Sequence, residues 1–260
     1  MVNMERSPEE IQSLADEIRI NGYVLLDGMI SEDRVEAMRS AFDPLLQAKR
    51  DADPPNRGVN RFQMHLPFEM PFADPTLYAN PTVMAILENL FGKDYILTYF
   101  ASDTPFPGSD YQKVHLDCRL PFPEGPFGAP VYSVVLNTPL VDFTEENGPL
   151  EIWPGGTHMI AGPRDLERMA AKMPSVRLLP KTGSILLRDA RMWHRGTPSR
   201  GPRSRPNVAL VYSRGWFRFE SHPYRMKIPR AAYESFPDSL KPMFRYCAIL
   251  ELDGSIADVA

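Results

Sequence analysis

Short apolar runs separated by turns rich in glycine and proline are the feature that most constrains how this chain can fold. The clearest runs cover residues 23–26, 95–100, 131–137, 150–153, 184–189 and 207–212. Their length and their content of β-branched and aromatic residues predict strands. Because the intervening segments are short and few helices follow residue 95, the pattern favours a β-sandwich or a β-barrel. The 27 prolines scatter between the runs, which is typical of a loop-rich β protein.

Helices are predicted in the first part of the chain. Ser7, Pro8 and Glu10 form a capping box with proline at the first helical position, and apolar residues then repeat at helical spacing. A second helix is predicted from Ser31 and a third from Asn80. We therefore expect a single domain over residues 1–260, in which the helical residues 1–50 pack on the outside of the β structure. Residues 50–60 are expected to form a loop, and residues 61–72 a partly buried connection or, alternatively, a segment near a substrate mouth.

Bulk composition excludes several classes of protein. A net charge of −4 argues against an electrostatic nucleic-acid binder. The two cysteines imply no disulfide framework, so a reduced, cytoplasmic protein is expected. Residues 1–10 lack the apolar core of a signal peptide, and no apolar run is long enough for a membrane span. The expected partner is a small molecule, while the oligomeric state is left open.

A histidine and a carboxylate lie two positions apart in the predicted strand 112–117. Alternate side chains share one face of a strand, so His115 and Asp117 should point the same way. His194, at the end of a later predicted strand, is the natural third member. Two imidazoles and one carboxylate form a facial Fe(II) site that leaves three coordination positions open. A His-x-Asp alone is weak, and a surface pair or a hydrogen-bonded core pair is the alternative.

Arg205 strengthens the metal-site interpretation. It lies eleven residues after His194, at the start of the next predicted strand. A guanidinium at that place could form a bidentate pair with a carboxylate of a metal-bound oxo-acid. Asp189 and Arg191 could support the site as a second pair, although an exposed pair is favoured.

The order of these motifs resembles the phytanoyl-CoA dioxygenase family. The matching pieces are His-Leu-Asp at 115–117, Asn-Gly-Pro-Leu at 147–150, Pro-Gly-Gly-Thr-His at 154–158, Trp-His-Arg-Gly at 193–196, and Arg205. The family's usual Pro-Gly-Ser-His is altered here, and residues 21–25 are also similar to its N-terminal pattern. The resemblance covers most of the chain. It implies a mainly β protein with flanking helices, built as a double-stranded β-helix of the jelly-roll, cupin-like type.

The resemblance also implies a cofactor set and residue roles. These are Fe(II) bound by His115, Asp117 and His194, and the cosubstrates 2-oxoglutarate and O2, with Arg205 on the distal carboxylate of 2-oxoglutarate. Gln112 matches a glutamine that related members place near the cosubstrate. Thr197 falls near a position where a small hydroxyl residue can help to bind the cosubstrate. Asn137 stands where a tryptophan is common. Because a carboxylate occupies position 117, halogenation is disfavoured.

Substrate contacts are predicted at three further residues. Arg119 continues the alternation of residues 115 and 117 and could meet an anionic group, although a solvated strand end is equally compatible with the sequence. Tyr99 and Tyr132 are candidates to line the pocket, with core packing as the favoured alternative.

The resulting hypothesis is a non-haem Fe(II)- and 2-oxoglutarate-dependent dioxygenase of the hydroxylase type. It would oxidise a C–H bond of a small molecule, and a secondary-metabolite intermediate is among the substrates that the resemblance allows. Two alternatives remain open: a zinc-dependent hydrolase that uses the same three ligands, and a non-catalytic β-barrel that binds a small molecule.

Overall fold

The computed structural model describes residues 6–118, 120–123, 128–160, 165–218 and 225–258. Its α-helices are α1 (Pro8–Asn21), α2 (Glu32–Ala52), α3 (Pro75–Tyr78), α4 (Pro81–Phe91), α5 (Leu166–Ala170) and α6 (Arg230–Glu234), and its 3₁₀ helices are η1 (Thr157–Met159) and η2 (Lys241–Phe244). Its strands are β1 (Tyr23–Leu26), β2 (Arg61–His65), β3 (Tyr95–Pro105), β4 (Ser133–Pro139), β5 (Leu150–Ile152), β6 (Val176–Leu178), β7 (Ile185–Asp189), β8 (His194–Gly196), β9 (Asn207–Arg214), β10 (Lys227–Pro229), β11 (Ala248–Leu250) and β12 (Ile256–Asp258). Among the described helices, none has both the length and the apolar character needed to cross a membrane.

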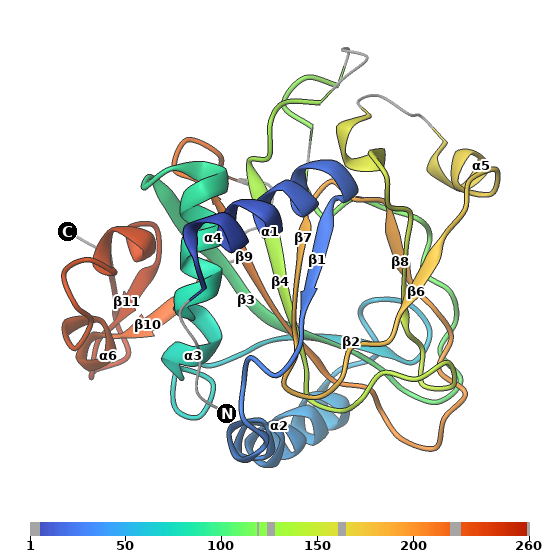
Figure 1. The fold of residues 1–260 in the computed structure, drawn as a ribbon. Helices are drawn as coiled ribbons and strands as arrows, with labels where there is room; N and C mark the ends of the chain where they lie inside the picture. Colours follow the sequence, from blue (N-terminus) through green and yellow to red (C-terminus); the bar gives the residue numbers. More distant parts are fainter. Residues whose placement is uncertain (1–5, 119, 124–127, 161–164, 219–224, 259–260) are drawn as a thin grey trace.

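Two antiparallel sheets form the body of the molecule. The main sheet has the strand order β1-β7-β4-β9-β3-β2, and the smaller sheet has the order β6-β5-β8. His115 pairs with His194 of β8 and so extends the smaller sheet by a single bridge. From β6 to β9 the chain alternates between the two sheets, and the architecture is the double-stranded β-helix that the family resemblance implies. A separate sheet near the C-terminus, β10-β11-β12, lies beside the body (Figure 1).

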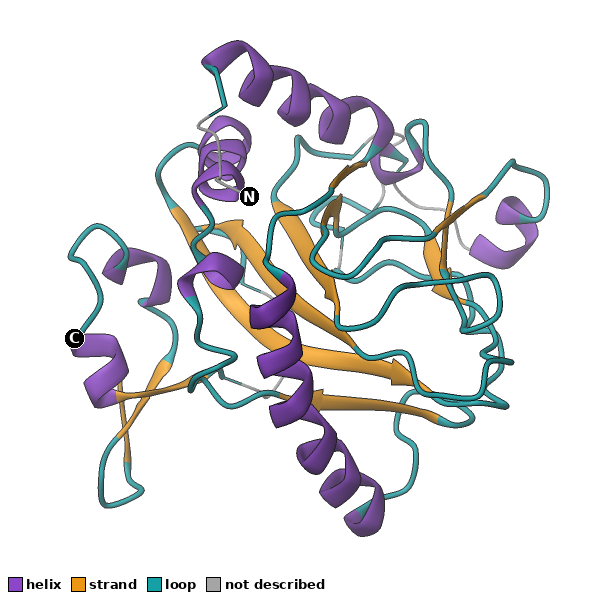
Figure 2. Cartoon of the chain, turned by 60° about the horizontal axis from the view of Figure 1, so that its bottom comes forward, coloured by secondary structure: helices purple, strands orange, loops and turns teal. Residues whose placement is uncertain are grey.

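Alternation along the strands divides the main sheet into a helix-covered face and a cavity face. On β4, Val134 and Leu136 join the same hydrophobic core as the helices, whereas Val135 and Asn137 line a cavity. Helices α1 and α4 cross the covered face, and α2 packs at its edge (Figures 1 and 2). The apolar core and the cavity therefore use opposite faces of the same strands.

The predicted helix ends are confirmed where capping residues mark them. Ser7 and Glu10 form the expected reciprocal hydrogen bonds at the start of α1, and Gly22 ends the helix with a φ of 86°. Asn80 caps α4 through the backbone N–H groups of residues 82 and 83. The second helix continues two residues beyond the predicted boundary at 50, and accommodates Pro44 within it.

Three predictions about local structure are wrong. Residues 112–117 do not form a continuous strand, because only His115 pairs with β8, while the N–H of Asp117 bonds to the carbonyl of Ala190 instead. Residues 61–65 form edge strand β2, where a connection was expected. The Asp189–Arg191 pair is buried, with a separation of 2.6 Å, rather than exposed.

Candidate metal centre and cosubstrate pocket

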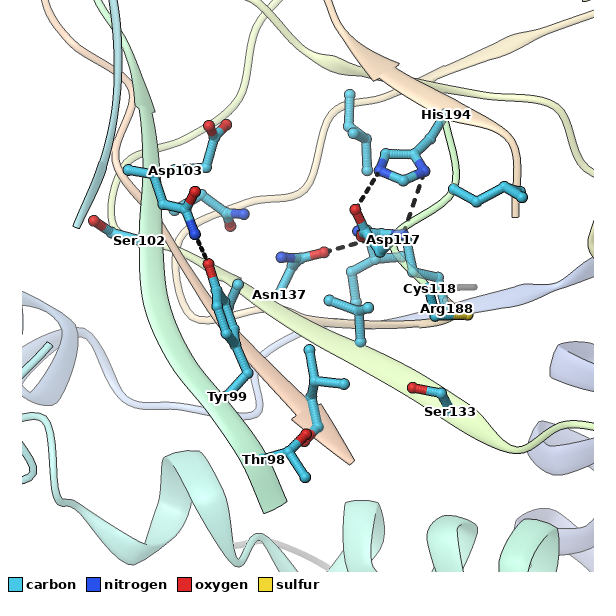
Figure 3. A pocket seen from close by; sticks show the side chains of 18 of the residues that line it. Thr98, Tyr99, Ser102, Asp103, Asp117, Cys118, Ser133, Asn137, Arg188 and His194 are labelled. Carbon is cyan, nitrogen blue, oxygen red and sulfur yellow. Dashed lines mark hydrogen bonds and ion pairs between the residues drawn. The ribbon is translucent and has the colours of Figure 1, made fainter. Parts of the chain in front are cut away.

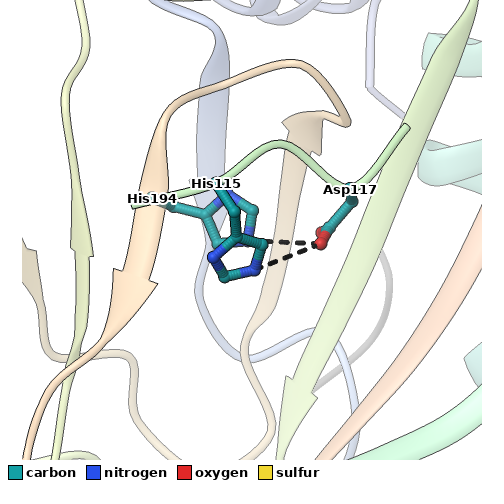
Figure 4. A group of neighbouring side chains, drawn as sticks. All are labelled: His115, Asp117 and His194. Atoms are coloured by element: carbon teal, nitrogen blue, oxygen red, sulfur yellow. Dashed lines mark ion pairs between the residues drawn. The ribbon is translucent and has the colours of Figure 1, made fainter. Parts of the chain in front are cut away.

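His115, Asp117 and His194 converge from distant parts of the chain. One donor atom from each lies within 4.8 Å of the others. Asp117 Oδ1 is 3.6 Å from His115 Nε2 and 3.4 Å from His194 Nε2 (Figure 4). The backbones of His115 and His194 exchange hydrogen bonds of 3.0 and 3.2 Å, which holds the two imidazoles side by side. The segment therefore places His115 and Asp117 together without the regular strand that the sequence predicts.

Both imidazoles are oriented by the backbone. Nδ1 of His115 is 2.8 Å from the carbonyl of Lys113, and Nδ1 of His194 is 2.8 Å from the carbonyl of Met192. A carbonyl can only accept, so each Nδ1 carries a proton, and in the neutral form of the ring the lone pair then lies on Nε2, which faces Asp117. This is the tautomer that binds a metal ion through Nε2.

Burial and neighbouring charges set the protonation of the group. Burial, together with the neighbouring His194, lowers the pKa of His115 to about 4. Burial raises the pKa of Asp117, but the charge of Arg188 and the interactions with the two histidines outweigh it and hold that pKa well below its usual range. At neutral pH the group thus offers a neutral His115 and an ionised carboxylate. Two imidazoles and one carboxylate on one side of a cavity fit an iron site.

The turn that carries His194 is held by a buried ion pair. Arg191 donates to both carboxylate oxygens of Asp189, through Nε at 2.9 Å and Nη2 at 2.6 Å. The carbonyl of Ala190, within this turn, accepts the N–H of Asp117 at 2.8 Å. One turn therefore sets the positions of two of the three converging residues.

Arg205 lies at another part of the same cavity and is 2% exposed. Its N–H bonds to the carbonyl of Pro105, and its guanidinium stacks on Phe143 at 4.1 Å. Its Nε has no hydrogen-bond partner among the described residues, and the nearby Asp103 is paired with Arg61 at 2.9 Å. Burial lowers the pKa of Arg205 to about 9, so the group is a desolvated cation at neutral pH. Such a cation is suited to bind a carboxylate.

The cavity joining these groups has a volume of about 630 Å3. Figure 3 shows its residues from close by, with Asn137 between Tyr99 and the Asp117 carboxylate. Apolar side chains from β3, β4 and β9 line one part of it, and the hydroxyls of Ser133 and Ser213 meet there at 3.0 Å. The volume is within the range of pockets that hold drug-sized ligands.

The structure brings some of the other predicted residues to this cavity and not others. Gln112, Asn137 and Tyr99 line it. The side-chain carbonyl of Gln112 accepts from the N–H of Gly196 at 2.9 Å. Thr197 is outside the lining, and its hydroxyl donates to the carbonyl of Pro149 at 2.7 Å.

Two of the predicted substrate residues lie elsewhere. Tyr132 is fully buried and packs against Phe217, with ring centroids 4.5 Å apart, and it is not part of the cavity lining. Arg119 lies outside the described residues.

Sequence reasoning missed Arg188, which contacts three of the predicted residues. It donates to the Asp117 carboxylate and, through Nε, to Asn137 Oδ1 at 3.3 Å. Its Nη1 also lies 3.4 Å from His194 Nδ1, but both atoms are donors here, so this is a contact and not a hydrogen bond. A detectable signal existed, because a charge inside an apolar strand must be partnered when it is buried.

Several solved structures share this architecture. The non-haem alpha ketoglutarate dependent epimerase SnoN from nogalamycin biosynthesis is 21% identical, with a TM-score of 0.62, over 80% of this chain and 82% of SnoN. HygX from Streptomyces hygroscopicus, with nickel and 2-oxoglutarate bound, is 15% identical, with a TM-score of 0.62, over 86% of this chain and 91% of HygX. AviO1 from Streptomyces viridochromogenes Tue57 is 17% identical, with a TM-score of 0.62, over 84% of this chain and 99% of AviO1. At these identities the likeness shows the fold.

The family itself is shown by the sequence. The family model described as phytanoyl-CoA dioxygenase (PhyH) matches residues 18–207, which is well over half of the chain and includes all three converging side chains and Arg205. The matched order of motifs, the double-stranded β-helix and the His-Asp-His group agree with one another. The chain belongs to the phytanoyl-CoA dioxygenase family.

Proposed function

We propose that this protein is an Fe(II)- and 2-oxoglutarate-dependent dioxygenase that oxidises a C–H bond of a small molecule by hydroxylation or a related reaction. The observation that carries the proposal is one cavity with two features. The donor atoms of His115, Asp117 and His194 meet within 4.8 Å in one part of it, and the desolvated guanidinium of Arg205 faces another part.

Each residue has a defined task in this proposal. The two imidazoles present Nε2 lone pairs, and Asp117 presents Oδ1, so the ion is held from one side. Arg205 binds the distal carboxylate of 2-oxoglutarate, which satisfies its orphaned Nε. When bound, iron and 2-oxoglutarate supply oxygen activation coupled to decarboxylation to succinate and carbon dioxide. The protein's share is to orient the cosubstrate and the substrate and to exclude water.

The cavity's remaining surface supports a substrate of moderate size and mixed polarity. Val135, Val211 and Leu97 provide apolar surface, and the paired hydroxyls of Ser133 and Ser213 provide polar groups. SnoN has been crystallised with Fe3+, alpha ketoglutarate and nogalamycin RO, and HygX with nickel, 2-oxoglutarate and hygromycin B. These complexes support a secondary-metabolite intermediate as the substrate here, and the mixed lining of the cavity supports hydroxyl or carbonyl groups on an apolar frame.

The proposal is tested by succinate release from 2-oxoglutarate under air with added Fe(II). We expect Asp117→Ala and His115→Ala to lose most of this turnover, because each leaves the ion with two protein ligands. Arg203→Ala, an exposed neighbour of Arg205, is the control and should keep it. Undiminished turnover in the ligand variants would refute the proposal. Turnover of a small-molecule substrate by hydrolysis, without oxygen and without 2-oxoglutarate, would indicate a zinc hydrolase instead.

A further inference from the structure

We propose that Arg188 is a positioning residue that restricts Asp117 to a single coordinating oxygen and keeps a metal position open for the cosubstrate. This inference rests on the proposed iron site. Arg188 lies on β7 among apolar neighbours, is 4% exposed, and faces the cavity together with Leu186. A charge so placed must have a partner, and its partner is the carboxylate of the metal group.

The two oxygens of Asp117 are divided between different partners. Oδ1 faces the two Nε2 atoms at 3.4 and 3.6 Å (Figure 4). Oδ2 accepts a hydrogen bond from Arg188 Nη2. A carboxylate can bind an ion with one oxygen or with both. While Arg188 holds Oδ2, only Oδ1 is free for the ion. Loss of that hydrogen bond would let Oδ2 turn toward the ion and take a position that 2-oxoglutarate needs.

Asn137 fixes the guanidinium in turn. Its Oδ1 accepts from Arg188 Nε at 3.3 Å, and it comes from β4, the neighbour of β7 in the main sheet. The arginine is thus held from two directions, and its planar shape carries the orientation from β4 to Asp117. This gives a role to the asparagine that replaces the family's tryptophan.

The charge of Arg188 acts in opposite directions on the two ligands. A cation beside Asp117 weakens the binding of Fe(II) and favours the binding of the 2-oxoglutarate dianion. Removing it should therefore leave metal affinity equal or higher while cosubstrate affinity falls. General damage to the site would lower both affinities together, so the signs separate positioning from a merely structural role.

The test is a pair of anaerobic titrations on Arg188→Met. Fe(II) binding is measured first, and 2-oxoglutarate binding is then followed by the charge-transfer absorption of the iron–cosubstrate complex. We expect Fe(II) affinity to stay equal or to rise. The affinity for 2-oxoglutarate should fall about tenfold, which is the size of the one charge-assisted hydrogen bond that holds Asp117 Oδ2 away from the ion. Arg188→Lys keeps the charge but loses the planar guanidinium that donates to both Asp117 and Asn137. Its 2-oxoglutarate affinity should therefore lie between those of the wild type and Arg188→Met.

Arg214→Met is the matched control. Arg214 lies on β9 of the same sheet, and its guanidinium donates to backbone carbonyls of residues 90, 91 and 131, away from Asp117. The Arg214→Met variant should keep the wild-type affinities for Fe(II) and for 2-oxoglutarate. If Arg188→Met lowers both affinities or changes neither, the inference is wrong; if that variant does not fold, the same two readings on Arg188→Lys decide. A wild type that shows no 2-oxoglutarate-dependent absorption would instead refute the proposed function.

Discussion

Arg205 shows how a single residue can serve binding at the expense of stability. Its side chain is 2% exposed, and its Nε has no partner in the described part of the chain. A buried charge without a counter-ion destabilises the folded state. Asp103 offsets this only in part, because it is ion-paired with Arg61. The free protein therefore holds a cation whose partner is expected to arrive with the cosubstrate.

Arg205→Met should separate the two effects. We expect the melting temperature of the metal-free protein to stay equal or to rise, since a desolvated charge is replaced by an apolar chain of similar length. The affinity for 2-oxoglutarate should fall by roughly a hundredfold, within the range for removing one partner of a buried charge pair. Thermal unfolding measures the melting temperature. Anaerobic titration with 2-oxoglutarate in the presence of Fe(II) measures the affinity.

Arg203→Met is the control for that experiment, because Arg203 is exposed and close in sequence. It should change neither quantity. A clear drop in melting temperature on Arg205→Met would contradict the interpretation, since it would mean that the interactions of the guanidinium in the free protein already outweigh the cost of burying its charge.

At the scale of elements, the turn before β7 depends on Gly183. Its carbonyl accepts the N–H groups of Met29 and Ile30, both at 2.9 Å, and so ties the segment after β1 to the main sheet. Gly183 has a φ of 81°, and a Cβ there would lie 2.4 Å from the carbonyl oxygen of Ile30. Both the backbone conformation and the space available therefore require glycine.

Gly183→Ala should destabilise the fold by roughly 2–4 kcal/mol, through a positive φ and a displaced backbone contact. Gly254 is a matched control, because it has the same φ of 81° and a Cβ added there would meet no described atom within 4 Å beyond its chain neighbours. Gly254→Ala should cost only about 1 kcal/mol, the strain of the positive φ alone. Urea unfolding of both variants measures the difference, and equal losses would contradict the role of the contact with Ile30.

The sequence predicts the elements whose side chains follow a simple pattern. Strands β1, β4, β7 and β9 lie where the apolar runs indicate, because alternate residues along them are apolar and join the helix-covered core. Strand β2 was missed because its first residue, Arg61, is charged yet 1% exposed, which breaks the expected pattern. The ion pair with Asp103 of β3 that permits this burial depends on tertiary structure.

The candidate site divides along the same line. His115, Asp117, His194 and Arg205 carry chemistry that their residue types reveal, so motif order was enough to select them. Arg188 was missed because its partners, Asp117 and Asn137, are distant in sequence. The roles of Thr197 in cosubstrate binding and of Tyr132 in substrate binding remain predictions. The hydroxyl of Thr197 donates to a backbone carbonyl, and the ring of Tyr132 is buried.

At the scale of the whole molecule, binding of metal and cosubstrate should be linked to folding. The converging ligands come from separate segments of the chain, so a ligand that joins them stabilises the folded state alone. At 2-oxoglutarate concentrations about 100-fold above the dissociation constant, with metal present, we expect about 2.7 kcal/mol of stabilisation. For a chain of this size that corresponds to a rise in melting temperature of roughly 5–10 °C.

The measurement is thermal unfolding under anaerobic conditions, with Fe(II) and 2-oxoglutarate added separately and together. Glutarate, which has both carboxylates but no keto group, is the control ligand and should raise the melting temperature much less. An equal rise with glutarate would contradict binding through the metal, and would leave Arg205 as the main determinant.

The alternation along β4 and β9 has a consequence for how this protein could acquire new substrates. Val135, Val211 and Ser213 face the cavity, while their immediate neighbours Val134, Leu210 and Tyr212 anchor the helical layer. Alternate residues of the same strands therefore determine substrate specificity and the stability of the fold. A library randomised at the first three positions should diversify selectivity while sparing the scaffold, which makes the sheet a natural starting point for directed evolution.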